Sequence, residues 1–231
     1  MKIQTIESSL QAAKNWERKG QPVWISRCLS TALMGYLSIA VEDYGDADSA
    51  IAWLLQQGVH ALLSRHLDAT TRLAVDVDFG KLPGSTLGGI YYHLVFAHLA
   101  WLMTAREPGE SYVKIAVRPD VREVSTPFWY EYSLALESMV LGKGYCANEF
   151  QPHGQEKYWM GYLRLIESAS NGWPLDDAIA EIDRLFTIRN TDKSIKDDVY
   201  QIEGSGEYPA KWDFRRRGLL NYIRFGASRL L

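Results

Sequence analysis

Apolar residues repeat at helical spacing along most of this chain, whereas strand-like alternation is rare. The clearest example is the C-terminal segment 211–231, where arginines mostly flank or oppose an apolar stripe. The stripe consists of Trp212, Leu219, Leu220, Ile223, Ala227 and Leu230. Because residues three or four apart share one face of a helix, this stripe predicts an amphipathic helix packed against a core. The same reasoning along the whole chain predicts an all-α fold.

Further helices are predicted between turns that contain glycine, proline or aspartate. They span residues 6–18, 22–44, 48–66, 90–106, 127–142, 155–170 and 174–186. Segments 22–44 and 90–106 are apolar almost all round, and we therefore expect them inside the protein. Altogether we expect about seven to nine helices, packed as antiparallel hairpins in a helical-repeat-like array.

Three segments depart from this pattern. Residues 68–89 combine a short alternating stretch with several glycines, which predicts a long loop that has room for one short strand. Residues 112–117 fit a second short strand, and residues 191–209 are polar enough for a surface connection. No low-complexity tract or linker divides the chain, so we expect a single helical domain over residues 1–231.

Charge and cysteine content narrow the classes of partner. The chain has 231 residues, a formal net charge of -3 and a pI of about 6.0. It lacks the positive field that attracts nucleic acid or anionic lipid, so we expect neither as a partner. The most apolar stretch, residues 88–103, is shorter than the ~20 residues that span a bilayer. Two cysteines and a charged N-terminal segment without a signal-like apolar run favour a cytoplasmic protein.

The histidines do not have the spacing of a metal site. His93 and His98 are five residues apart, so on a helix their rings diverge by roughly 140 degrees and would not share an ion. We interpret them, together with His60 and His66, as structural residues. The sequence therefore predicts no metal, no cofactor and no enzymatic activity. The alternative is an enzyme in which folding gathers His93, His98 and Glu137.

Two other pairs of residues each allow a catalytic interpretation and a simpler structural one. Cys146 and His153 share one predicted loop, where a thiolate beside an imidazole could act as a nucleophile. We favour a partly buried thiol and a surface histidine. Glu131 and Glu137 are six residues apart and lie on different helix faces, which favours solvent-facing charges over an acid/base couple.

The densest acidic cluster lies at a predicted turn between two helices. It comprises Glu42, Asp43, Asp46 and Asp48. Asp46 or Asp48 can accept hydrogen bonds from the free amides of the following helix. Capping and solubility are the simplest roles of these carboxylates, and an anionic patch facing a basic partner is the functional role. These four residues are the candidate partner-binding site.

The basic counterpart is the triplet Arg215, Arg216 and Arg217, which follows Trp212 and Phe214. Arginines beside aromatic rings can bind nucleic acid by stacking. In a chain of net negative charge, however, one such triplet favours a solvated helix face or pairing with acids elsewhere in the fold.

One short pattern occurs twice. Residues 48–54 and 176–182 both read Asp, a second polar residue, Ala-Ile-Ala and then a largely apolar continuation. The small residues would suit close packing in stacked helical hairpins, and they would equally suit any helix start. Both explanations stay open, because no full repeat period is visible.

Three segments carry a resemblance to the all-helical immunity proteins of bacterial polymorphic-toxin systems, nearest to the immunity protein 49 family. They are the turn and helix start Tyr-Gly-Asp-Ala-Asp-Ser-Ala-Ile at residues 44–51, the helix Tyr-Glu-Tyr-Ser-Leu-Ala-Leu at 130–136 leading into Gly142, and Arg-Gly-Leu-Leu-Asn-Tyr at 217–222. The resemblance covers most of the chain in layout and few positions in identity.

The resemblance implies a small cytosolic antidote that binds one cognate toxin and blocks it stoichiometrically, without turnover and without a cofactor. The alternative is a tetratricopeptide-like scaffold that holds a peptide or a partner helix in a groove. The two differ in affinity, because an antidote should bind one folded protein at about nanomolar Kd, whereas a scaffold should bind peptides more weakly.

Overall fold

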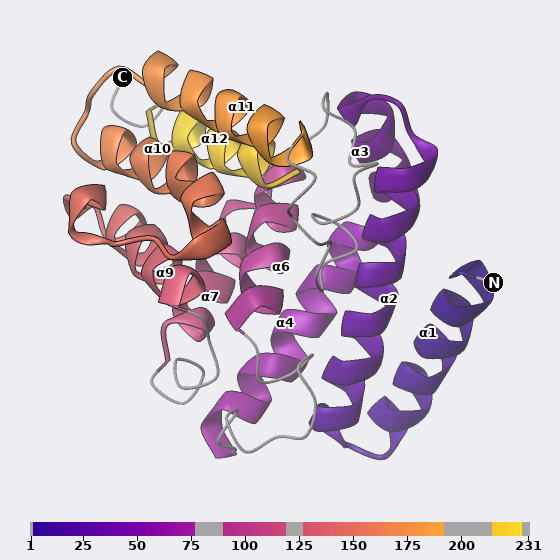
Figure 1. Cartoon of the computed structure of the whole chain (residues 1–231). Helices are drawn as coiled ribbons and strands as arrows, with labels where there is room; N and C mark the ends of the chain where they lie inside the picture. Colours follow the sequence, from indigo (N-terminus) through magenta and orange to yellow (C-terminus); the bar gives the residue numbers. More distant parts are fainter. Residues whose placement is uncertain (1, 77–89, 119–126, 192–213, 228–231) are drawn as a thin grey trace.

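The computed structural model describes residues 2–76, 90–118, 127–191 and 214–227, and most of these residues are helical (Figure 1). They form ten α-helices and two short 3₁₀ helices, with no strand within the described ranges. The elements are α1 (Lys2–Arg18), α2 (Pro22–Asp43), α3 (Ala47–Gln56), α4 (Val59–Asp76), α6 (Ile90–Leu102), α7 (Arg106–Ala116), α9 (Pro127–Val140), η2 (Ala147–Glu149), η3 (Gly154–Trp159), α10 (Met160–Ser170), α11 (Asp176–Thr191) and α12 (Phe214–Ala227). The predicted all-α fold class is confirmed.

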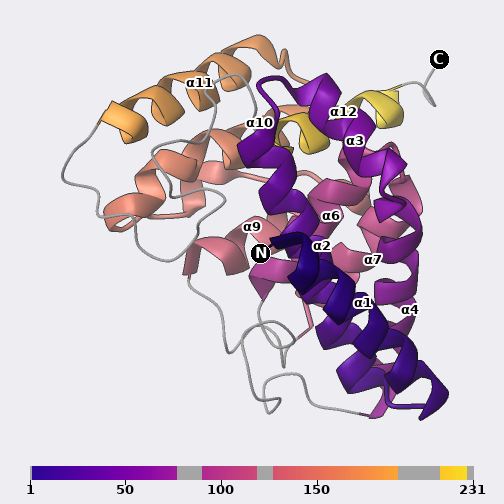
Figure 2. The ribbon, with the colours of Figure 1, turned by 90° about the vertical axis from the view of Figure 1, so that its right-hand side faces the viewer.

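Helices that follow one another pack mostly as hairpins. The α1–α2 hairpin turns at Gly20, whose φ of 61° is accessible to glycine without strain, and α2 begins directly afterwards at Pro22. The pairs α6–α7 and α10–α11 pack in the same way, while α2 also packs against α4. The C-terminal helix α12 departs from chain order because it packs against α6. Figure 2 shows α1 lying in front of α2 when the molecule is turned.

Most of the buried apolar side chains form one large cluster, which extends from Ala13 in α1 to Tyr222 in α12, and Ile6, Ala32 and Ile39 form a small second cluster. Helix α6 lies at its centre, since every residue from His93 to Leu102 is buried. Burial on all sides explains why this segment is apolar all round. Segments 22–44 and 90–106 are predicted to lie inside the protein. This is confirmed for α6 in the second segment. Helix α2, in the first segment, packs against α1 and against α4.

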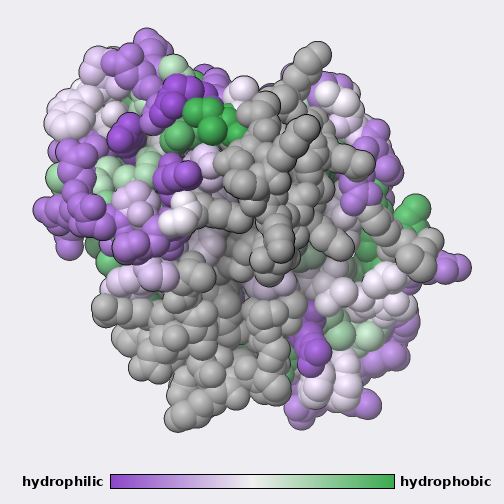
Figure 3. Space-filling view, viewed as in Figure 1, coloured by the Kyte–Doolittle hydropathy of each residue, from purple (hydrophilic) through white to green (hydrophobic). Residues whose placement is uncertain are grey.

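By length and composition alone, α2 could also cross a bilayer, and no other helix in the described ranges could. In the structure, 44% of the apolar window of α2 is buried against other helices. Outside the residues drawn in grey, Figure 3 shows a surface that is mostly hydrophilic, with small separate hydrophobic patches.

The predicted third helix, 48–66, is two helices in the structure. Gly58 interrupts it with a φ of 70°, a conformation that commonly ends a helix. Helix α4 then continues to Asp76, so the predicted loop 68–89 is wrong over its first nine residues. Residues 77–89 lie outside the described ranges, as do residues 192–209 of the predicted surface connection.

Residues 112–117 were expected as a strand and instead form the second half of α7. Tyr112, Val113, Ile115 and Ala116 are all buried, which fits one helix face as well as a short buried strand. The sequence Arg106 to Glu110 favours the helix, because the two side chains form an ion pair four residues apart, at 2.7 Å.

Candidate functional site

The four acidic residues at the α2–α3 turn, which we call the acidic turn, are all exposed. Glu42 and Asp43 end α2, Asp46 precedes α3, and Asp48 lies in the first turn of α3. The structure therefore brings the predicted residues together at one corner. Figures 1 and 2 place this corner at the same end of the molecule as α11 and α12.

Two residues of the acidic turn also have roles within the fold. Asp46 is the N-cap of α3, because its Oδ1 accepts a hydrogen bond from the Ser49 amide at 2.9 Å and its Oδ2 accepts one from the Ser49 hydroxyl at 2.7 Å. These bonds lower the pKa of Asp46. Asp48 forms an ion pair with Arg217 of α12. The predicted cap is confirmed at Asp46.

Half-buried aromatic rings lie beside the acidic turn. Tyr44, inside the turn, packs against Trp53 of α3 with ring centroids 5.6 Å apart, and Trp53 also contacts Tyr36 of α2 at 5.8 Å. Leu55, also on α3, is 48% exposed. We call the acidic turn together with Tyr36, Tyr44, Trp53 and Leu55 the corner surface.

The corner surface combines two properties of protein-binding sites. Half-buried rings offer large, rigid apolar area to a partner at little entropic cost, and they are common anchors in interfaces. Exposed carboxylates around them favour a partner of positive charge and penalise a negative one. The arrangement suits recognition of a basic protein surface.

The arginine triplet has three different environments. Arg216 is paired with Asp183 of α11 at 3.1 Å, and Arg217 is paired with Asp48, so the expectation of pairing with acids elsewhere is confirmed for both. Arg215 differs, because it is 1% exposed. The expectation that Arg215 flanks or opposes the apolar face of its helix is therefore wrong.

Aromatic rings surround the guanidinium group of Arg215. Its central carbon lies 4.2 Å from the ring centroid of Trp129 and 5.6 Å from that of Tyr132, both in α9. It lies 5.5 Å from Trp159, at the end of η3, and 5.7 Å from Tyr162 in α10. We call these four rings the arginine cage. Four side chains from three elements thus meet one residue of α12, which sequence spacing alone does not reveal.

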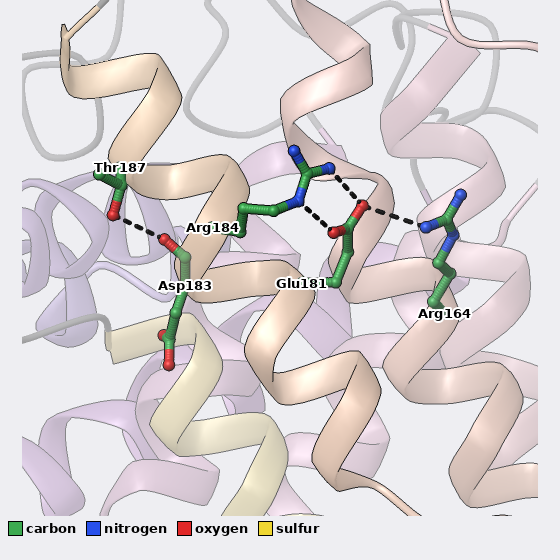
Figure 4. Close-up of polar contacts among 5 residues, drawn as sticks. All are labelled: Arg164, Glu181, Asp183, Arg184 and Thr187. Atoms are coloured by element: carbon green, nitrogen blue, oxygen red, sulfur yellow. Dashed lines mark hydrogen bonds and ion pairs between the residues drawn. The ribbon is translucent and has the colours of Figure 1, made fainter.

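A surface network connects α10 to α11 beside this region (Figure 4). Glu181 accepts hydrogen bonds from Arg164 at 3.0 Å and from Arg184 at 2.7 Å and 2.9 Å. The bond from Arg184 is the main cause that lowers the pKa of Glu181. Thr187 donates to the backbone carbonyl of Asp183, whose carboxylate binds Arg216. These contacts join α11 to α10 and to α12.

His98 and His66 are buried, and both rings make hydrogen bonds. His98 Nδ1 donates to the Leu94 carbonyl at 2.5 Å, so His98 Nε2 accepts from the Tyr132 hydroxyl at 2.7 Å. Burial, helped by the nearby positive charge of Arg215, lowers the pKa of His98 to about 3.

His66 has an equivalent environment between α2, α4 and α7. Its Nε2 lies 3.2 Å from the Ser26 hydroxyl and its Nδ1 lies 2.8 Å from the Tyr112 hydroxyl. Burial, with a smaller contribution from His93, lowers the pKa of His66 to about 3. These contacts support the structural interpretation of His66 and His98. His93 is buried as well, and His60 is exposed.

The other residues considered as functional candidates belong to no cluster with the composition of a metal site, within the part of the chain that the structure describes. Among the residues that the structure describes, no group of three or more His, Cys, Asp or Glu side chains could hold one ion, and this includes His93, His98 and Glu137. Cys146 and His153 are both exposed, so the expected partial burial of the thiol is wrong. Glu131 accepts a hydrogen bond from Tyr145 at 2.8 Å.

Comparisons of the chain with protein-family models, with curated protein sequences and with solved structures give no match.

Proposed function

We propose that this chain is an immunity protein that binds one cognate bacterial toxin stoichiometrically and blocks it through the corner surface. The carrying observation is that exposed carboxylates and half-buried rings meet at the α2–α3 corner. The resemblance of residues 44–51 to helical immunity proteins falls on the same corner. The expected partner is a folded protein that presents basic side chains around an apolar centre.

The fold supports an antidote over an open scaffold. In a helical solenoid each unit packs only against its neighbours, which leaves a long groove for peptides. Here α12 packs against α6, and its Arg217 reaches Asp48 of α3. These contacts link segments far apart in the sequence, which favours a compact antidote over a solenoid with a peptide groove.

The first experiment tests the proposed function directly. The chain is co-expressed with the toxin encoded by the neighbouring gene, and bacterial growth and complex formation by size exclusion are measured. Rescue of growth with a one-to-one complex supports the proposal. Growth arrest with no complex refutes it, and binding to many unrelated peptides supports the scaffold instead.

The second experiment tests the surface. Asp43→Lys reverses a charge at the end of α2, where a cation suits the helix dipole, so the fold should be kept. We expect the affinity for the toxin to fall about tenfold or more. Glu149→Lys is the matched control, since it makes the same charge change at an exposed site on η2. Equal affinities of the two variants would show that the toxin binds elsewhere.

A further inference from the structure

The arginine cage has the composition of a receptor for a flat cation. Two tryptophans and two tyrosines have their ring centroids within 5.7 Å of the guanidinium carbon of Arg215. The electron-rich face of an aromatic ring attracts cations, most strongly in tryptophan and where water is excluded. Trp129 is the nearest ring, with its centroid 4.2 Å from the guanidinium carbon, and only 7% of the residue is exposed.

A guanidinium group suits this site better than an ammonium group. Guanidinium is planar, its charge is delocalised and it is weakly hydrated, so it loses less on leaving water and can stack on rings. Lysine would bring a compact and strongly hydrated charge. The cage should therefore distinguish the two cations.

The cage also lies where α12 begins. Phe214 and Arg215 start the helix and are both buried. One turn later, Gly218 lies so close to α6 that a β-carbon there would be 2.5 Å from the backbone oxygen of His98. Further along, Tyr222 donates to Glu110 of α7 at 2.7 Å. Arg215 thus connects α12 to α9, η3 and α10 through the cage.

We propose that the arginine cage is a guanidinium-binding site that Arg215 fills from within the chain, and that its occupancy determines whether the start of α12 stays docked. The ligand class is an alkylguanidinium cation. When Arg215 is shortened, the cage takes such a cation from solution. This inference is independent of the proposed toxin binding.

The test is chemical rescue of the full-length Arg215→Ala variant. The substitution removes an ethylguanidinium fragment, so N-ethylguanidinium is the probe and N-ethylurea is its neutral counterpart. Hydrogen exchange of the α12 amides and the Tm are measured with and without each compound. We expect α12 amides to exchange about tenfold faster in the variant. N-ethylguanidinium should slow that exchange and raise the Tm by about 2–4 °C, while N-ethylurea should not.

Further control measurements keep the outcome clear. Wild-type protein with N-ethylguanidinium corrects for general salt and denaturant effects, and Arg217→Ala is the control for losing an arginine outside the cage. If Arg215→Ala does not fold alone, refolding with N-ethylguanidinium replaces the melting experiment, and Arg215→Lys is measured beside it. Arg215→Lys should leave α12 exchange faster than in the wild type. Equal protection in Arg215→Lys, or no difference between the two compounds, overturns the proposal.

Discussion

Aromatic rings and charges occur together at two places in this protein, and they are arranged in opposite ways. In the arginine cage, four rings enclose a cation that is 1% exposed. At the corner surface, the carboxylates of the acidic turn are exposed, and the nearby rings of Tyr36, Tyr44 and Trp53 are half-buried. A buried charge must be compensated by its neighbours, so it becomes part of the fold. An exposed charge costs little to keep and is available to a partner.

The largest expected effect comes from buried histidines, which should make the folded protein lose stability in acid. His98 lies beneath α12 with a pKa of about 3, whereas an unfolded histidine titrates near pH 6.5. Between these values the unfolded chain binds a proton that the folded chain does not bind, so stability falls as the pH falls. From pH 6 to pH 4 the loss is roughly 2–3 kcal/mol for His98, and His66 should add a similar loss.

Urea unfolding at several pH values checks this dependence. His98→Gln should reduce the slope of unfolding free energy against pH by about 1 kcal/mol per pH unit in this window. His153→Gln, which changes an exposed ring, is the matched control. If His98→Gln has the same slope as the wild type, His98 binds a proton as readily in the folded protein as in the unfolded chain.

The second expected effect concerns the spacing between α12 and α6. Gly→Ala within a helix usually stabilises it by about 1 kcal/mol. At Gly218 the sign should be reversed, because the new β-carbon would lie 2.5 Å from the His98 carbonyl oxygen, which belongs to a backbone that cannot turn aside. We expect Gly218→Ala to cost about 2 kcal/mol in thermal or urea unfolding.

Gly35→Ala is the matched control for this prediction. Its β-carbon would meet the side chain of Ile6 at 2.7 Å, and a side chain can change rotamer where a backbone cannot. Gly35→Ala should therefore be tolerated better. If both substitutions stabilise the protein, α12 packs less closely on α6 than the structure indicates.

The sequence predicts most helices because their apolar periodicity is strong, and it misses features that depend on helix contacts. Pro22 and Pro127 begin helices as expected, and Asp46 caps α3 as expected. Gly58 carries no side-chain signal that distinguishes a helix break from a helix interior, so α3 and α4 were expected as one. In α7, the apolar run from Tyr112 is too short to separate helix from strand by periodicity.

The arginine cage could have been partly foreseen. Arg215 is four residues before Leu219 and seven before Tyr222, which places it on the buried face of α12. From the sequence we nevertheless expect Arg215 to flank or oppose the apolar face, because arginine side chains are rarely buried. The rings of the cage come from distant segments, so only the fold identifies them. Similarly, the contact of Tyr36 with Trp53 depends on the angle between α2 and α3.

A smaller effect should separate the two roles of Asp46. Asp46→Asn keeps an N-cap oxygen and removes the charge, whereas Asp46→Ala removes both. We expect the Tm to fall with alanine and to stay nearly unchanged with asparagine. Toxin affinity, measured by calorimetry, should fall for both variants if the charge is used in binding. Full affinity in Asp46→Asn would restrict Asp46 to capping.

The smallest effect is expected where the two regions meet. Arg217 of α12 pairs with Asp48 of the acidic turn, and both side chains are substantially exposed, at 39% and 83%. Exposed ion pairs contribute little because water and salt screen them, so a double-mutant cycle of Arg217→Ala and Asp48→Ala should give a coupling of about 0.5 kcal/mol or less. A larger coupling would mean that the acidic turn belongs to the docking of α12. In that case Asp48 could not be offered to a partner without loosening the helix, and the separation between a buried structural region and an exposed binding corner would fail at this pair.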